Sequence, residues 1–353
     1  MCFTFAPHKT RNMETIYLLI VVFLLCLAVF DLFVGVSNDA VNFLQSAIGA
    51  KVATFKVVLI VASLGVLLGA TMSSGMMDVT RHGIMLPSHF SYHEVMIVFL
   101  AVMVTDVIVL DMFNSLGMPT STTVSLVFEL LGGAFVLALL KMHADPSLAF
   151  SDLLNTDKAL SVIIAIFVSV AVAFFFGVIV QWISRVIFTF NYSRVSHIAT
   201  ALFGGVAFTA LSYFIFLKGL GKSPYISADV RDFMDANITW LLCATFVVSS
   251  IAMLLVQLVK VNVFKFVVLM GALAMAFAGN DLVNFIGVPL AGLDSYLDFT
   301  SNAQGVSADS YLMTSLMESA KTPPFYLLLA GVIMIIAMAT SKKAQNVIKT
   351  SVD

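Results

Sequence analysis

A polar motif that occurs twice carries the side chains best suited to binding an ion. Residues 37–43 read SNDAVNF and residues 279–285 read GNDLVNF, which gives an offset of 242 residues (279 minus 37). Each copy follows an apolar run and offers amide and carboxylate oxygens, which suit a hard cation such as Na⁺. The oxygen-bearing side chains are Asn38, Asp39, Asn42, Asn280, Asp281 and Asn284.

A single Asn-Asp pair at the end of an apolar run is often only a helix cap. Two copies in corresponding positions favour a function, because an ionised aspartate in hydrocarbon costs several kcal/mol and such residues usually mark an ion or substrate path. We therefore expect each motif to lie where a membrane helix is broken, since a break exposes backbone and side-chain oxygens to a bound cation.

A second group of polar side chains opens a later apolar run. Residues 116–123 read LGMPTSTT, so that a glycine and a proline interrupt the helix and four hydroxyl groups follow. Hydroxyls and free backbone N–H groups at the positive end of a helix can bind an anion. An ordinary N-cap cluster would explain the same pattern. The hydroxyl residues are Thr120, Ser121, Thr122 and Thr123.

Four further acids lie in or beside apolar runs: Asp31, Asp106, Asp111 and Glu129. We expect each of them either to line the ion or substrate pathway or to pair with a polar neighbour at the membrane interface. Asp31 lies two helical turns before Asn38, so that it is the first of the four to test.

The elements that must position these groups are membrane helices. Apolar residues form 60% of the 353 positions and charged residues only 11%, far from the composition of soluble domains. The net charge of −2 argues against a nucleic-acid partner. The three cysteines and six histidines lack metal-ligand spacing, so that we expect no metal site and no cofactor beyond the coupling cation.

About nine transmembrane segments are expected, in an all-α polytopic fold that lies in a lipid bilayer. The first apolar run could pass for a secretory signal, but no small-residue cleavage site follows it. Polar stretches occupy residues 218–237 and 294–322. The apolar runs cover residues 16–36, 55–77, 94–112, 124–142, 158–188, 196–218, 238–259, 262–278 and 324–341.

The doubled motif divides the chain into related parts. We expect an N-terminal extension at 1–15, a first transporter repeat at 16–143, connecting helices and a polar loop at 144–237, and a second repeat at 238–353. Threading the runs gives the helices before Asn38 and Asn280 opposite directions. This arrangement predicts an inverted-topology repeat with broken or re-entrant helices.

The chain resembles the inorganic phosphate transporter family, the PiT-type sodium- or proton-coupled carriers. The resemblance rests on residues 35–42 (GVSNDAVN), 278–284 (AGNDLVN) and 117–123 (GMPTSTT) and spans nearly the whole chain. It implies an inverted-repeat fold, often dimeric, with phosphate and cations between the Asn-Asp segments and the Ser/Thr hairpins. It also implies that Asn38, Asp39, Asn280 and Asp281 are site residues and that the hydroxyls of 120–123 contact phosphate.

Two departures from that family pattern stand out. Val124 occupies the position where the family typically has histidine, so that no proton-carrying role falls there. The family also has a second Ser/Thr hairpin, which the 242-residue offset from Thr120 would place at 362, beyond Asp353. We therefore expect the second repeat to be completed by further sequence or by another chain.

The function expected from the sequence is secondary active transport of inorganic phosphate with a coupled cation, in a multi-pass protein of the plasma (inner) membrane. Na⁺ is favoured over H⁺, because the motif oxygens suit a hard cation and the motifs contain no histidine. A sulfate or other oxyanion permease, an ion channel and a membrane-embedded enzyme are the alternatives. An enzyme is disfavoured because no catalytic nucleophile–base pair is evident.

Overall fold

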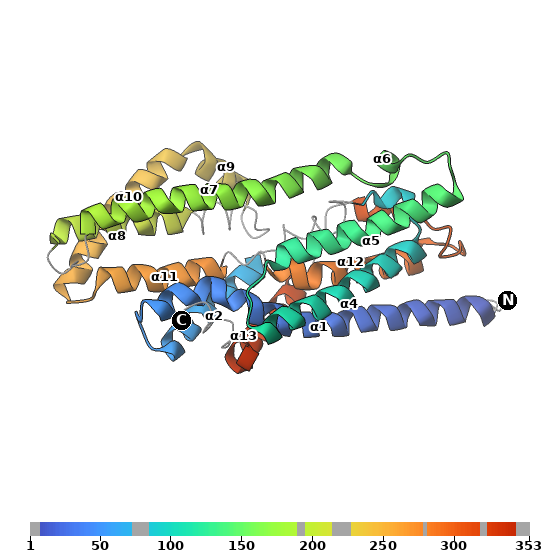
Figure 1. Ribbon diagram of the computed structural model, residues 1–353, viewed down its shortest axis with the longest axis horizontal. Coiled ribbons are helices and arrows are strands. Elements are labelled where there is room, and N and C mark those ends of the chain that lie inside the picture. Colours follow the sequence, from blue (N-terminus) through green and yellow to red (C-terminus); the bar gives the residue numbers. More distant parts are fainter. Residues whose placement is uncertain are drawn as a thin grey trace.

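The protein is built from helices. The computed structural model describes residues 8–72, 85–188, 195–213, 227–277, 281–317 and 323–343, which form helices and two isolated β-bridges. Most helices lie along one long axis of the molecule (Figure 1). The α-helices are α1 His8–Gly49, α2 Phe55–Met72, α4 Tyr92–Leu116, α5 Thr122–Ala144, α6 Phe150–Leu153, α7 Thr156–Phe188, α8 His197–Ser212, α9 Ala228–Ala236, α10 Ile238–Leu258, α11 Val263–Phe277, α12 Asp281–Asn302 and α13 Pro324–Thr340, and short 3₁₀ helices cover Pro87–His89 and Thr314–Met317.

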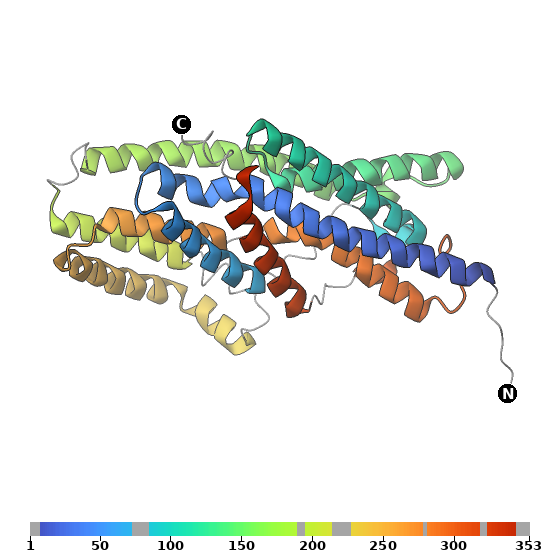
Figure 2. The same cartoon turned by 90° about the horizontal axis from the view of Figure 1, so that it is seen from below.

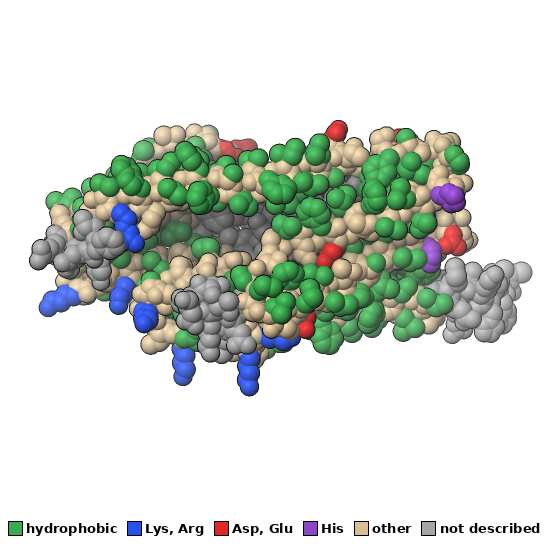
Figure 3. All heavy atoms as spheres, viewed as in Figure 1, with side chains coloured by type: hydrophobic (Ala, Val, Ile, Leu, Met, Phe, Trp, Pro, Cys, Tyr) green, Lys and Arg blue, Asp and Glu red, His purple; other side chains and the backbone are tan. Residues whose placement is uncertain are grey.

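The apolar surface of the helices suits a lipid surrounding. Within the described residues, five helices are long and apolar enough to cross a membrane: α1, α4, α5, α7 and α10. Four shorter apolar helices, α2, α8, α11 and α13, fall on the remaining apolar runs. The most apolar stretch of α7 contains no buried residue, and hydrophobic side chains cover much of the face in Figure 3. A total of nine membrane crossings stays a prediction.

Two hydrophobic clusters share helix α1. The first half of α1 packs with α4, α5 and α12, and the second half packs with α2, α11 and α13. Figure 2 shows α2 and α13 beside the middle and far part of α1. The two clusters therefore meet on α1 at Leu27 and Ala28, and residue 38 lies in the second half of the helix.

Helices α1 and α4 run in the same direction and keep one register along their contact. The Tyr17 and Tyr92 rings lie 4.7 Å apart, and the Asn38 side chain hydrogen-bonds to Asn114. The two pairs are 75 and 76 residues apart in sequence, so that α1 and α4 advance together. Residues with the same offset between these pairs consequently lie at the same level of the bundle.

Helix α12 packs against α1 in the opposite direction. The Phe285 ring lies so close to Gly35 that a β-carbon there would come within 2.0 Å of it. Further along, Gly292 faces Leu24 in the same way, with the added carbon 2.8 Å from Leu24. Each glycine thus makes room for the side chain of the other helix, and any larger residue would push α1 and α12 apart.

One expectation from the sequence is wrong, and one helix was not expected. No break occurs at Asn38 and Asp39, because α1 is continuous from His8 to Gly49. The helix needs no break, since the Asn38 side chain finds hydrogen-bond partners on neighbouring elements. The polar stretch expected from residue 294 begins inside a 22-residue helix, α12, which includes Pro289. Its apolar part, residues 285–293, is much shorter than the roughly 20 residues that predict a membrane span.

Helices α4 and α5 form a hairpin that is closed at both ends. At the turn, Gly117 takes a left-handed conformation (φ 69°) that ends α4, and the Ser121 side chain accepts a hydrogen bond from Val124 N–H at the start of α5. The turn is therefore held in one backbone conformation, and it carries the hydroxyl residues of 120–123.

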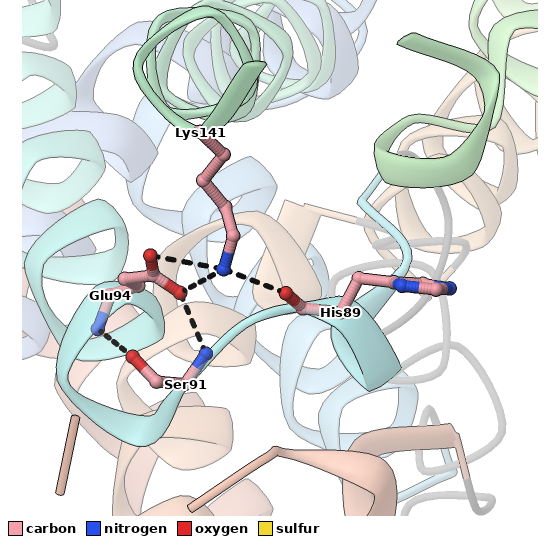
Figure 4. A network of polar contacts seen from close by, with 4 residues as sticks. All are labelled: His89, Ser91, Glu94 and Lys141. Carbon is pink, nitrogen blue, oxygen red and sulfur yellow. Dashed lines mark hydrogen bonds and ion pairs between the residues drawn. The ribbon is translucent and has the colours of Figure 1, made fainter. Parts of the chain in front are cut away.

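A network of polar contacts closes the other end of the hairpin (Figure 4). The Ser91 and Glu94 side chains form a capping box at the start of α4. From α5, Lys141 Nζ donates to Glu94 Oε2 at 2.8 Å and to the His89 carbonyl oxygen at 2.8 Å. The same ammonium group lies 5.2 Å from the Phe90 ring centre. These contacts fix α5 relative to α4.

We predict that Lys141→Met lowers the free energy of unfolding by about 1 kcal/mol, because it removes a charge-assisted contact whose partners are each 23% exposed. Thermal or denaturant unfolding of the purified protein in detergent measures the change. The control is Lys158→Met on the exposed start of α7, which should stay within about 0.5 kcal/mol of the unsubstituted protein. Equal effects of the two substitutions would contradict a fixing role for Lys141.

Candidate functional site

Two polar residues in the second half of α1 point into the protein. Asn38 is fully buried and Asp39 is 2% exposed. A buried amide or carboxylate is costly unless it is hydrogen-bonded, so that the partners of these side chains define the site.

The Asn38 amide uses all of its hydrogen-bonding atoms to hold the α4–α5 hairpin. Its Nδ2 donates to Asn114 Oδ1 at 2.9 Å and to the Met118 carbonyl oxygen at 3.1 Å. Its Oδ1 accepts the Thr120 backbone N–H at 2.7 Å. Asn114 in turn donates from Nδ2 to the Val34 carbonyl oxygen at 2.6 Å. One side chain therefore joins α1 to the end of α4 and to the turn before α5.

A chain of hydrogen bonds joins the two copies of the motif through the hydroxyl segment. Thr122 Oγ1 donates to Asp39 Oδ2 at 3.0 Å. Asn284 Nδ2, from the second copy, donates to Thr122 Oγ1 at 3.1 Å and to Thr123 Oγ1 at 2.9 Å. The Thr122 hydroxyl thus donates to one motif and accepts from the other. Asp39, Thr122 and Asn284 are all buried.

Some residues named from the sequence lie elsewhere or are not described. Asn42 is on the exposed side of α1, and the Ser121 hydroxyl is used as the cap of α5. Asn280 lies outside the described residues. Asp281 begins α12, and its side chain is likewise outside the description. Their roles stay predictions.

Of the four further acids, three lie together and one lies apart. The carboxyl groups of Asp31 on α1, Asp106 on α4 and Glu129 on α5 are adjacent in the interior. Asp111 is about half exposed and forms an ion pair with Lys343, beyond the end of α13. The structure thus separates Asp111 from the other three acids.

The structure adds two site neighbours that the sequence reasoning missed. Asn114 was overlooked because it follows the end of the apolar run, yet it is eight residues after Asp106, about two helical turns on. Ser37 Oγ donates to the Phe33 carbonyl oxygen at 2.6 Å and lies 2.7 Å from Ser341 Oγ. No sequence signal points to a contact between residues 304 positions apart.

The arrangement has the chemistry for both a cation and an anion. Carboxylate and amide oxygens of Asp39 and Asn38 are ligands of the type that hard cations prefer. The start of α5 supplies the positive end of a helix dipole beside the hydroxyls of Thr122 and Thr123, which suits an anion. Among the described residues, no group of three His, Cys, Asp or Glu side chains is placed to hold a metal ion.

The described residues form helices with a lipid-compatible surface and a polar, buried centre, a combination typical of membrane transporters. Residues 35–351 match the phosphate transporter family, and the chain belongs to that family. The structure is similar to a solved structure described as the sodium-dependent phosphate transporter, with a TM-score of 0.69 at 19% identity. The similarity covers 94% of this chain and 78% of that one. No curated protein matches the sequence. The protein is therefore an integral membrane protein of a phosphate-transporting family.

We predict that Asn114→Leu lowers the free energy of unfolding by about 1–3 kcal/mol, because it removes the contacts to Asn38 and Val34 without changing side-chain volume greatly. Unfolding in detergent is the measurement. The matched control is Asn302→Leu at the exposed end of α12, where the amide contacts only Asp298 and a loss below about 0.5 kcal/mol is expected. A stable Asn114→Leu protein would mean that the network does not hold the hairpin.

Proposed function

We propose that this protein carries inorganic phosphate across the plasma (inner) membrane together with a cation, and that Na⁺ is the cation. The observation that carries the proposal is the hydrogen-bonded chain from Asp39 through Thr122 to Asn284. It brings the two copies of the motif and the hydroxyl segment to one buried place. The cation binds the motif oxygens of residues 38, 39, 280, 281 and 284, and phosphate binds the hydroxyls and the start of α5.

Electrostatics links the two ligands. The Asp39 carboxylate alone would repel phosphate by several kcal/mol at the low effective dielectric of the interior. A bound cation removes that repulsion, so that each ligand raises the affinity for the other. The same carboxylate can accept a hydrogen bond from a protonated phosphate oxygen. Sulfate has no such proton near neutral pH, which favours phosphate over sulfate.

The choice of Na⁺ has two supports. The oxygens are those of a hard-cation site, and the similar solved structure is described as sodium-dependent. The antiparallel packing of α1 and α12, which carry the two motif copies, supports the proposal of inverted repeats. The boundaries of those repeats at residues 16–143 and 238–353, and a homodimer, are part of the same proposal.

We predict that Asp39→Asn abolishes cation-coupled phosphate uptake while the protein still inserts and folds, since the substitution keeps size but removes the charge that holds the cation. The measurement is uptake of labelled phosphate in proteoliposomes, normalised to inserted protein. Asp281→Asn is expected to behave in the same way. Asp157→Asn, at an exposed position on α7, is the control and should transport normally. Near-normal, Na⁺-dependent uptake by Asp39→Asn would show that the motif is only structural.

We predict that an inward Na⁺ gradient drives saturable phosphate accumulation and that a pH gradient in Na⁺-free medium does not. A parallel measurement with labelled sulfate distinguishes a phosphate carrier from a general oxyanion permease. For a phosphate carrier, sulfate should compete with phosphate weakly or not at all. Uptake driven equally by the pH gradient would refute Na⁺ coupling. Non-saturable flux down the phosphate gradient alone would indicate a channel.

A further inference from the structure

Three acidic side chains from three helices meet in the interior between the aromatic end of the bundle and the Asn38 network. Asp31 and Asp106 are both fully buried, and Glu129 is partly buried. Asp31 and Asp106 are 75 residues apart, the same offset as the contacting pair Tyr17 and Tyr92. The parallel packing of α1 and α4 therefore brings Asp31 and Asp106 to one level of the bundle. We call Asp31, Asp106 and Glu129 the acid triad.

The acid triad lacks donors for its oxygens. Both carboxyl oxygens of Asp31, both of Asp106 and Glu129 Oε2 have no hydrogen-bond donor in the part of the chain that the structure describes. The Ser125 hydroxyl donates to Glu129 Oε1 at 2.8 Å, and although it also lies close to Asp106, it has only one proton to donate. A buried polar atom without a partner costs free energy, so that five such atoms in one place need an explanation.

The carboxyl groups contact one another directly. Asp31 is within hydrogen-bonding reach of Asp106, and Asp106 is within reach of Glu129. An ionised carboxylate has only acceptor atoms, so that two carboxyl groups can hydrogen-bond only if a proton lies between them. Among the described residues, these three side chains are not placed to hold a metal ion.

No described cationic side chain faces the acid triad. On α1, the nearest charged group is the Asp39 carboxylate, which is of the same sign. On α4 and α5, Glu94 and Lys141 pair with each other at the far end of the hairpin. Asp111 of α4 pairs with Lys343. On α12, the contacts on either side of this level are apolar, from Phe285 to Gly292. Three ionised carboxylates in such surroundings would repel one another strongly.

We propose that Asp31, Asp106 and Glu129 form a proton-binding site that is separate from the Asn38–Asp39 network. The proton is shared between carboxyl oxygens and satisfies atoms that otherwise have no donor. A cavity of about 450 Å³ between α4 and α5 is lined by Glu129, Ser125 and Thr105, so that Glu129 is the member that exchanges protons with the outside.

The site also bears on cation binding at Asp39. Asp31 precedes Asp39 by eight residues on the continuous helix α1, which is about 12 Å. At an effective dielectric of about 20, one unit of charge at that distance changes a binding equilibrium about tenfold. An acid triad that has lost a proton therefore favours Na⁺ at Asp39, and proton uptake disfavours it. This consequence rests on the proposed function, whereas proton binding itself does not.

Infrared spectroscopy of the purified protein tests proton binding without transport. We expect the C=O stretching band of a protonated carboxyl group at neutral pH, with clear loss of intensity in Asp106→Asn and no loss in Asp157→Asn. Glu129→Gln is the second variant, because a partly buried position tolerates substitution if Asp106→Asn does not fold. A spectrum without this band, or a band that is unchanged in both triad variants, overturns the proposal.

Adding Na⁺ during the infrared measurement shows whether the acid triad binds a proton or a second sodium ion. In Asp39→Asn protein, where the proposed cation site has lost its charge, adding Na⁺ at constant pH should leave the carboxyl band unchanged. Loss of the band on Na⁺ addition would mean that the acid triad itself binds Na⁺, and the proposal would fall.

Uptake measurements test the link to Asp39. The apparent affinity of the unsubstituted protein for Na⁺ should fall about tenfold as the pH is lowered and the acid triad becomes fully protonated. This pH dependence should flatten in Glu129→Gln. If the infrared band behaves as expected but uptake is not driven by Na⁺, the proton site stands and the proposed function fails. A pH dependence that is the same in Glu129→Gln would overturn the link.

Discussion

The buried amide of Asn38 holds the centre of this protein together. Its three hydrogen bonds reach the last turn of α4, the carbonyl of Met118 and the N–H of Thr120, and no apolar side chain could replace them. The hairpin turn would otherwise leave these backbone groups unpaired in an apolar interior, which costs more than the bonds themselves contribute. The position of Thr122, and with it the contact to Asp39 and Asn284, follows from this attachment.

The resemblance to the phosphate transporter family implied that the motif copies and the hydroxyl segment lie together. Asn38, Asp39, Thr122 and Asn284 do meet. The break in α1 was predicted wrongly, since Asn and Asp are common both at helix caps and at buried lateral contacts. Only tertiary packing decides between these uses. Helix α12 was missed because its apolar part, residues 285–293, is too short for a membrane span of about 20 residues and contains Pro289.

The two polar levels of the α1–α4–α5 bundle differ in how their atoms are satisfied. Around Asn38 every amide atom has a partner of the opposite hydrogen-bonding type. Around Asp31 and Asp106 the atoms are acceptors that face acceptors. The hydrogen bonds at the first level hold the helices in place. The negative charge at the second level can be neutralised only by an exchangeable ion, such as a proton. Parallel packing of α1 and α4 places both levels on the same pair of helices.

The uninterrupted backbone of α1 has a consequence for how ion preference could change among related proteins. The peptide carbonyls of a continuous helix are occupied by its own hydrogen bonds, so that α1 can contribute to the proposed cation site only through side chains. A selectivity filter made of main-chain carbonyls resists single substitutions, because every residue type has the same carbonyl. A shell made of an asparagine and an aspartate does not. A single nucleotide change in either codon can exchange the side chain for one of different charge or denticity, and the preferred ion of such a carrier is therefore readily altered by mutation.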